Sequence, residues 1–399
     1  MKRRHLFWVS IAAALLLTSC SGQTVPSGTS VPSDVPASSA AETTPPTTVP
    51  TAYTDPLTGI TYENRDLTGQ TAAYFELPLE GATGYASVNM PVYSAADSQS
   101  GVSATLKPGD AFTVLEETDG TWWRIAREDG TAGWVDNTCC YLNIPDVVPS
   151  IVFDNTNAYS SVFVSSGKDI PAITGEVLYE SQCYNGRFGR ERYAVAANYI
   201  MVKKIYAAQQ AALAEGYTLV INETFRPYDI QLKIAADLKQ LYLDDPEVKA
   251  GIDLPPWGIG WFIANKISTH QTGCAMDVSL AKVNTIRFEL CGSYRYAAVT
   301  DYTACVMPTP IHELSAAAVS MQKPVNSYSP TAWKSVEPAA SMTEDALRLR
   351  VYCTQAGLSP LASEWWHFND LEAKDAIGDN YTTDVFYINT CCSRIPEEG

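Results

Sequence analysis

Residues 21–50 cannot contribute to a folded core, and this fixes where in the chain a domain can begin. The segment contains no aromatic residue, and 18 of its 30 residues are Ser, Thr or Pro. Such a composition buries too little apolar surface to offset the conformational entropy that ordering costs. The sequence therefore predicts a Ser/Thr/Pro-rich tether over residues 20–80, with the globular structure after it.

The first twenty residues have the form of an export signal. Basic residues at positions 2–4 precede an apolar run over 6–17, which is too short to span a bilayer as a helix. The run ends in Leu-Thr-Ser-Cys at 17–20, which resembles the bacterial lipobox. The resemblance implies a signal peptide of residues 1–19 and a lipid on Cys20 that anchors an exported protein to the cell membrane, facing the cell wall. The alternative is an ordinary secretory signal in which Cys20 is incidental.

Charge and cysteine content narrow the class of protein further. The chain has 27 Lys and Arg against 44 Asp and Glu, a formal net charge of −17. Phosphate backbones repel a body this acidic, so no nucleic-acid partner is expected. Export permits disulfides, and the odd number of cysteines after Cys20 predicts at least one free thiol or an intermolecular disulfide. No spacing indicates a four-cysteine zinc site, and the adjacent pairs at 139–140 and 391–392 favour one distant partner for each pair.

Residues 81–146 consist of short β-type runs separated by turn signals. The turns include Lys-Pro-Gly-Asp at 107–110 and Glu-Asp-Gly at 128–130, and strands are expected at 86–93, 111–115, 122–126 and 133–135. These are enough for a small all-β barrel. The runs Gly-Thr-Trp-Trp-Arg-Ile and Gly-Trp-Val make the module similar to bacterial SH3 domains, which implies a module that binds the cell wall or acts as a spacer. The alternative is a barrel that only packs on its neighbour.

Longer elements follow in residues 147–399. Helices are predicted at 194–215, 230–242 and 343–356, the last with a capping signal at 341–344. Strands are predicted at 217–225, 276–280 and 365–368. Helices and strands without a regular βα repeat predict an α+β domain.

Two histidines and an aspartate in this domain are candidate metal ligands. His270, Asp277 and His367 would make a tripod for one Zn²⁺ per chain, with a coordination position left for water. On a helix, the seven residues from His270 to Asp277 would span about 10.5 Å, which is too far for two ligands of one ion. Gly273 instead favours a turn followed by a returning strand, which would bring both side chains together.

Two charged residues have the chemistry that peptide hydrolysis requires. Glu364 lies three residues before His367, and a bend between them would place its carboxylate beside the ion as a general base for water. Arg226, held at a strand end by Pro227, could stabilise the oxyanion of a tetrahedral intermediate.

Four segments, taken in order, resemble the bacterial zinc D-Ala-D-Ala dipeptidases and D,D-carboxypeptidases, most closely the vancomycin-resistance dipeptidases. They are Thr-Phe-Arg-Pro at 224–227, the Ser-to-Asp run at 268–277, Met-x-Thr-Pro at 307–310 followed by Glu-Leu-Ser, and Glu-Trp-Trp-His-Phe at 364–368. The resemblance covers about residues 148–394 and implies an α+β zinc peptidase domain with an antiparallel sheet and flanking helices. It also implies the roles of ligand, general base and transition-state stabiliser in the site residues His270, Asp277, His367, Glu364 and Arg226.

The same resemblance implies the substrate contacts. Ser268 would hold the substrate carboxylate, while Trp365 and Trp366 would wall a pocket for a small side chain such as the methyl group of D-Ala. One position departs from the pattern, because the dipeptidases usually have an Asp where this chain has His312. An imidazole holds a free ammonium poorly, which favours trimming of a longer stem peptide. For His312 a supporting or loop role is the alternative to substrate contact.

The leading hypothesis is therefore a membrane-tethered zinc D,D-peptidase acting on free D-Ala-D-Ala or on peptidoglycan peptides that end in it. A rival from another class is a wall-binding lipoprotein whose catalytic-looking domain only recognises peptide. Glu364 and Arg226 speak against that rival, because binding alone needs neither a proton acceptor nor an oxyanion partner. A third hypothesis is an endopeptidase with a different cut position on the same zinc scaffold.

Overall fold

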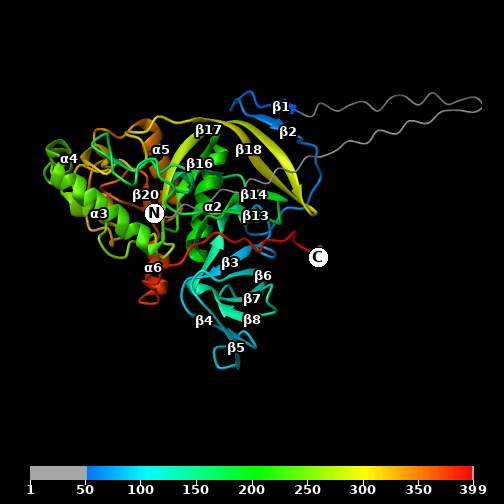
Figure 1. Ribbon diagram of the computed structural model, residues 1–399. Helices are drawn as coiled ribbons and strands as arrows, with labels where there is room; N and C mark the ends of the chain where they lie inside the picture. The colour runs from blue at the N-terminus through cyan, green and yellow to red at the C-terminus, as the bar shows by residue number, and fades with distance from the viewer. Residues whose placement is uncertain (1–51, 398–399) are drawn as a thin grey trace, which may run out of the picture. The chain divides into compact units, whose positions relative to one another are not determined.

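The computed structural model describes residues 52–397. The predicted signal peptide, Cys20 and the predicted tether up to residue 51 lie outside the described residues. The described chain contains two eight-stranded sheets and six α-helices and is a mixed α/β structure (Figure 1). No helix within 52–397 combines the length and the apolar content that a membrane crossing needs.

The first sheet carries the candidate site and is built around its longest strand, β17. This strand pairs antiparallel with β16, β18 and β20 and parallel with β2, while β10 pairs parallel with β16. The expectation of an antiparallel sheet is therefore wrong for two pairs of strands, β2 with β17 and β10 with β16. The strand predicted at 276–280 is part of the much longer β17. The strands of this sheet are β1 (Ala52–Thr54), β2 (Thr61–Glu63), β10 (Val152–Phe153), β16 (Tyr217–Glu223), β17 (Ala275–Cys291), β18 (Tyr294–Ala304), β19 (Ser359–Pro360) and β20 (His367–Asn369).

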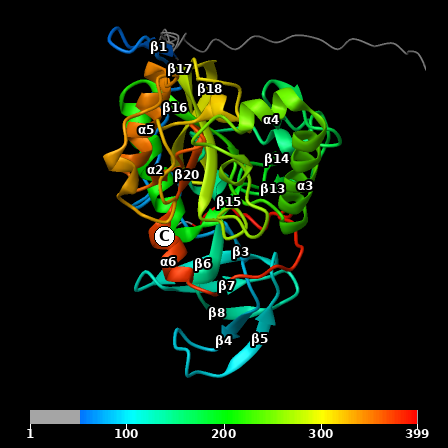
Figure 2. The same ribbon diagram turned by 90° about the vertical axis from the view of Figure 1, so that its left-hand side faces the viewer.

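Helices lie on both sides of this sheet, with α2 and α5 on one side and α3 and α4 on the other (Figure 2). The helix predicted from residue 194 begins at 199, because residues 196–198 pair as a strand and Asn198 caps the helix by accepting from the N–H of Ile200. The predicted cap of α5 is present, since Thr343 accepts from the N–H of Ala346. The helices are α1 (Ile144–Val147), α2 (Tyr199–Ala214), α3 (Tyr228–Asp244), α4 (Pro246–Ile252), α5 (Glu344–Gln355) and α6 (Leu371–Ile377).

The second sheet contains the β-rich module and one strand from beyond it. Its order is β15-β9-β3-β6-β7-β8-β4-β5. The strand expected at 86–93 is split in two, and β15 comes from the chain after the predicted boundary at 146. The strands are β3 (Thr83–Ala86), β4 (Met90–Tyr93), β5 (Val102–Leu106), β6 (Ala111–Thr118), β7 (Trp122–Ala126), β8 (Ala132–Asp136), β9 (Cys140–Asn143) and β15 (Ala196–Asn198).

The module and the rest of the folded chain share one hydrophobic core. The fully buried indole of Trp123 on β7 packs edge-on against Tyr199 at the start of α2, with ring centroids 4.7 Å apart. The C-terminal segment also contacts the module, because the hydroxyl of Thr113 donates to the carbonyl of Cys392 at 2.7 Å. The module is therefore an integral part of the fold.

Two short hairpins complete the fold, and one of them carries a disulfide. Cys183 on β13 is bonded to Cys391, which fits the expectation that one cysteine of the pair 391–392 has a distant partner. Neither Cys139 nor Cys140 has a disulfide partner among the described residues, so the same expectation fails for that pair. The hairpin strands are β11 (Val164–Ser165), β12 (Lys168–Asp169), β13 (Gln182–Asn185) and β14 (Arg190–Tyr193).

Residues 52–80 belong to the folded chain, so the tether predicted over 20–80 extends too far. Strands β1 and β2 form a hairpin whose second strand joins β17. The side chains of Ile60, Phe75 and Leu77 are buried. Apolar residues spaced this widely give no periodic signal, so only the tertiary contacts reveal that the segment is ordered.

Candidate metal centre

Strand register places three chemically active side chains in one row. Asp277 on β17 lies opposite Glu223 on β16 and opposite His367 on β20. Residues directly opposite each other in a sheet project from the same face, with Cβ atoms about 5 Å apart. The two carboxylates and the imidazole therefore meet on one face, and all three residues are buried.

His270 reaches this row from a loop that precedes β17. In the turn, the N–H groups of Gly273 and Cys274 donate to the carbonyls of His270 and Thr269. Gly273 has φ +64°, and a Cβ there would lie 2.7 Å from the ring of Tyr141. The turn and returning strand predicted from the glycine are therefore present, and both backbone conformation and space require glycine.

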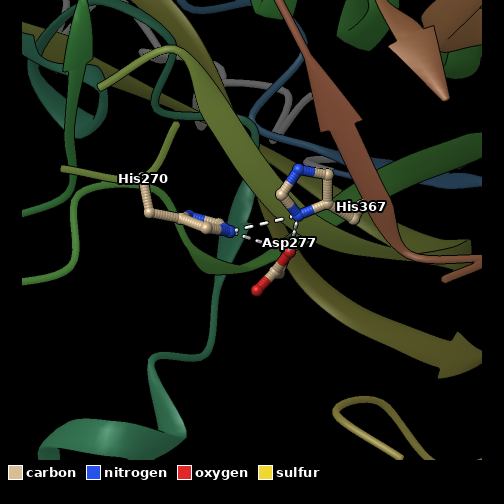
Figure 3. Close-up of side chains that lie close together, drawn as sticks. All are labelled: His270, Asp277 and His367. Atoms are coloured by element: carbon tan, nitrogen blue, oxygen red, sulfur yellow. Dashed lines mark hydrogen bonds and ion pairs between the residues drawn. The ribbon is translucent and has the colours of Figure 1, made fainter. Parts of the chain in front are cut away.

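The donor atoms of His270, Asp277 and His367 form a nearly equilateral triangle (Figure 3). Nε2 of His270 lies 3.2 Å from Nδ1 of His367 and 3.3 Å from Oδ1 of Asp277, and the latter two atoms are 3.1 Å apart. A tetrahedron around an ion with bonds of about 2.0 Å has edges of about 3.3 Å. The triangle therefore has the size of three ligands on one tetrahedral ion, with the fourth position left for another ligand.

The outer nitrogens of the two imidazoles are both hydrogen-bonded to oxygen. Nδ1–H of His270 donates to the carbonyl of Thr224 at 2.7 Å, and Nε2–H of His367 donates to Oδ1 of Asn369 at 3.0 Å. In the neutral rings, the inner nitrogens are then acceptors. Two acceptor nitrogens and a carboxylate oxygen this close repel one another unless a proton or a cation lies between them. The donor set therefore fits a divalent ion of the zinc type, and its outer hydrogen bonds are those that orient metal-binding histidines.

The two oxygens of Asp277 have different partners. Oδ1 faces the imidazoles, while Oδ2 accepts from Nη2 of Arg226 and from Nε2 of His312, both at 3.2 Å. Burial raises the pKa of the Asp277 carboxyl, but the charge of His270 and the hydrogen bonds from the histidines outweigh it and hold the pKa well below its usual range. Asp277 is thus a carboxylate that offers one oxygen to an ion.

Glu364 lies beside the triangle. The bend that its position requires is present at residues 365–366, directly before β20. Oε2 of Glu364 is 3.6 Å from Nδ1 of His367. Burial, opposed by the charge of His367 and aided by that of Asp277, raises the pKa of Glu364 to about 8. A carboxyl group with a raised pKa in such a position can both accept and donate a proton near neutral pH.

Arg226 is held in a buried network whose other main member, Glu223, sequence reasoning missed. Nε of Arg226 donates to Glu223 at 2.8 Å, Nη2 donates to Glu223 and Asp277, and Nη1 donates to Gln231 at 2.8 Å. Glu223 also accepts from the hydroxyl of Tyr179 at 2.8 Å. These bonds leave one N–H of the guanidinium without a partner among the described residues. The one sequence signal for Glu223 is its position directly before the segment 224–227.

A second group of potential ligands shares Asp277 with the first. It consists of Glu223, Asp277 and His312, all of them buried. The guanidinium of Arg226 contacts both carboxylates and supplies positive charge at this place. A second cation would be repelled by that charge, so the arrangement fits one ion per chain.

A cavity of about 300 Å³ opens onto the triangle. Glu364 and Arg226 line it together with the three candidate ligands. Ser268 and Trp366, two of the predicted substrate contacts, also line it. The cavity therefore brings together a candidate ion site, a proton acceptor and a cation.

The other two predicted substrate contacts lie behind the site. Trp365 is buried and donates its Nε1–H to the hydroxyl of Thr309 at 2.9 Å. His312 is fully buried, stacks on Phe163 with ring centroids 4.0 Å apart, and holds Oδ2 of Asp277. Neither side chain is part of the cavity lining, so the structure gives both residues supporting positions.

Comparison with known proteins identifies one part of the chain. No curated protein matches the chain. Residues 79–139 match the family model for the bacterial SH3 domain. The chain therefore contains a bacterial SH3 domain, and the prediction of such a module is confirmed.

Proposed function

We propose that this protein is a zinc-dependent D,D-peptidase that hydrolyses the D-Ala-D-Ala bond of peptidoglycan stem peptides or of the free dipeptide. The observation that carries the proposal is the triangle of donor atoms from His270, Asp277 and His367, with the carboxylate of Glu364 3.6 Å from one of its corners. A protein that only spaces or packs has no need of buried groups in this arrangement.

The three triangle residues would hold the ion. When bound, Zn²⁺ polarises a substrate carbonyl and makes water more acidic. The chain contributes the fixed orientation of both imidazoles, through the carbonyl of Thr224 and the amide of Asn369.

Glu364 would serve as the general base and then as the general acid. It accepts a proton from the attacking water and passes it to the amine of the leaving residue, so that one group performs both proton transfers. A pKa raised by burial suits this double role, because a carboxylate with its ordinary pKa is a weak base at neutral pH. Arg226 would neutralise the negative charge that develops on the substrate carbonyl oxygen.

Cavity chemistry and predicted location support the choice of substrate. Trp366 gives the cavity an apolar wall that suits a methyl side chain, and the hydroxyl of Ser268 would bind the terminal carboxylate. We further propose export and lipid anchoring through Cys20. Bacterial SH3 domains often bind the cell wall, which supports an action on wall peptides.

Product analysis tests the proposal. The full mature chain is incubated with D-Ala-D-Ala and with a stem pentapeptide, before and after removal of metal by a chelator, and products are identified by mass. We expect release of D-Ala, loss of activity with the chelator and recovery with Zn²⁺. Glu364→Gln should retain zinc and lose at least about a hundredfold in kcat, whereas Glu337→Gln, an exposed residue outside the cavity, should behave as wild type.

Three outcomes contradict the proposal. Activity that survives metal removal, or full activity in Glu364→Gln, excludes the mechanism. A product whose mass corresponds to cleavage of another peptide bond shows an endopeptidase. Binding of wall peptides without any turnover shows the non-catalytic wall-binding protein.

A further inference from the structure

A cavity of about 430 Å³ is lined by the hairpin β13–β14 together with strands β10 and β18. It shares no lining residue with the cavity at the candidate metal centre. Strands β10 and β18 contribute apolar side chains, among them Val152, Phe153 and Val299. Strand β14 contributes Arg190 and Arg192. The cavity therefore offers both apolar and cationic groups to a ligand.

The two arginines lie on the same face of their hairpin, because residues two apart on a strand project to the same side. Their partners across the ladder, Cys183 and Asn185, are buried, so this face is turned towards the protein. Glu191, between the two arginines, also contributes to the lining, but its side chain belongs to the opposite face and is exposed. Its carboxylate is therefore turned away from the two guanidinium groups.

Arg192 has no hydrogen-bond acceptor and no ion-pair partner among residues 52–397. Its side chain is half-buried, and Cζ lies over the ring of Phe188 at 4.4 Å from the centroid. The other carboxylate of the lining, that of Glu289, is already engaged, because Oε2 accepts from the hydroxyl of Tyr296 at 2.5 Å and lies 3.6 Å from Nη2 of Arg190. Burial and the charge of Arg190 both lower the pKa of Arg192. A half-buried guanidinium without an acceptor is available to an anionic ligand.

We propose that this cavity is a binding site for a small amphiphilic anion, a carboxylate or phosphate group attached to an apolar body. The guanidinium of Arg192 offers parallel N–H donors, whose geometry matches two oxygens of either group. Arg190 adds a second positive charge, and the side chains of β10 and β18 cover the apolar body. The site shares no residue with the candidate metal centre, so the inference is independent of the proposed function.

Three probes that share one apolar body test the inference. Binding of hexanoate, hexyl phosphate and hexanol to the full chain is measured by calorimetry at low ionic strength. We expect at least one of the anions to bind about tenfold more tightly than hexanol. Arg192→Gln should weaken binding of that anion about tenfold and leave hexanol unchanged, while Arg192→Lys, which keeps the charge but not the paired donors, should lose less.

Arg65→Gln is the matched control. Arg65 also lies over an aromatic ring, that of Tyr53, with Cζ 4.6 Å from the centroid, and it has no ion pair in the described part of the chain. It differs from Arg192 in being exposed and in lying outside the cavity. Thermal unfolding identifies any variant that fails to fold. If Arg192→Gln does not fold, the comparison of Arg192→Lys with the control replaces it.

Each outcome decides the inference without any measurement of peptidase activity. Loss of anion binding in the Arg192 variant alone supports the site, and the tighter of the two anions identifies the head group. Hexanol binding as tightly as both anions shows an apolar pocket and overturns the inference. An equal loss in the Arg192 and Arg65 variants, or no binding of either anion by wild type, overturns it as well.

Discussion

Asn369 is a single residue on which the orientation of a candidate metal ligand depends. Its Oδ1 accepts from Nε2–H of His367 at 3.0 Å and from the hydroxyl of Thr269 at 2.5 Å, and the residue is buried. Without this acceptor, the ring of His367 can take the other tautomer or turn away from the triangle.

We therefore predict that Asn369→Ala weakens zinc binding about 10- to 100-fold. The measurement is competition with a chromophoric chelator at fixed pH. Asn284→Ala is the control, because Asn284 bonds only the exposed hydroxyl of Thr303 in the long hairpin. Equal zinc affinity in the two variants would show that Asn369 does not orient the ligand.

Proton release is a second expectation at the scale of residues. Without metal, burial raises the pKa of Glu364 to about 8, and hydrogen bonding to Asp277 outweighs burial and raises the pKa of His367. Both groups therefore bind protons more tightly than an ordinary glutamate or histidine does, and a metal ion competes with those protons. We expect zinc affinity to rise from pH 6 to pH 8, with proton release visible by calorimetry in buffers of different ionisation enthalpy. Glu364→Gln should release fewer protons, and pH-independent binding would exclude the coupling.

At the scale of elements, residues 52–80 are joined to the main body by more than the hairpin β1–β2. Glu76 accepts from the N–H of Ser150 at 2.9 Å and from Gln210 at 2.7 Å. Burial raises the pKa of its carboxyl to about 7, although these hydrogen bonds oppose the shift. The folded state therefore keeps a proton on Glu76 in a pH range in which the unfolded chain has lost it.

This shift has a defined sign for stability. Between about pH 4.5 and pH 7 the folded state binds more protons at Glu76 than the unfolded state, so its contribution to the free energy of unfolding falls as pH rises. We predict that between pH 5 and pH 8 the free energy of unfolding falls by about 2 kcal/mol less in Glu76→Gln than in wild type. Urea unfolding at pH 5 and pH 8 measures it, with Glu337→Gln as the control. An unchanged difference between the two pH values would show that Glu76 titrates normally in the fold.

Element register also marks the limit of what the sequence could predict about the site. His270, Asp277 and His367 were found from residue type and from the turn at Gly273, which is a local signal. Glu223 was not found, because its part in the site depends on its position opposite Asp277 on the neighbouring strand. Pairing register is set by long-range contacts, which the sequence does not show. The same reason explains why the length of β17 and its parallel partner β2 were missed.

At the scale of the whole molecule, the SH3 domain and the candidate metal centre are structurally coupled. Strand β9 of the SH3 sheet pairs with β15, whose residue Ala196 accepts from the hydroxyl of Thr224 at 2.7 Å. The carbonyl of Thr224 in turn accepts from His270. The turns and tryptophans of residues 81–146 predicted the SH3 domain, but they indicated a module separate from the rest of the chain. Its coupling rests on a three-residue strand and on single contacts, neither of which has a periodic sequence signal.

Tyr141 is the most direct link between the two parts, and it carries the final prediction. Its hydroxyl donates to the carbonyl of Gln271 at 2.6 Å, and its ring would lie 2.7 Å from a Cβ on Gly273. Tyr141→Phe keeps the ring and leaves a buried carbonyl unpaired, which should cost about 1–3 kcal/mol of stability. Because that carbonyl belongs to the residue after His270, the variant should also bind zinc more weakly, by roughly tenfold.

A second tyrosine, on the neighbouring strand of the same sheet, separates positioning from general stability. The hydroxyl of Tyr85 donates to the carbonyl of Thr390 at 2.8 Å, and its ring is equally buried, but Thr390 is exposed and lies outside the loop that carries His270. Tyr85→Phe should lose less stability than Tyr141→Phe in urea unfolding, because the carbonyl of the exposed Thr390 can accept from water instead, and it should bind zinc as wild type does. If both variants lose zinc affinity in proportion to their stability, the SH3 domain supports the fold as a whole. If only Tyr141→Phe loses affinity, strand β9 holds the loop on which the candidate ligand His270 lies.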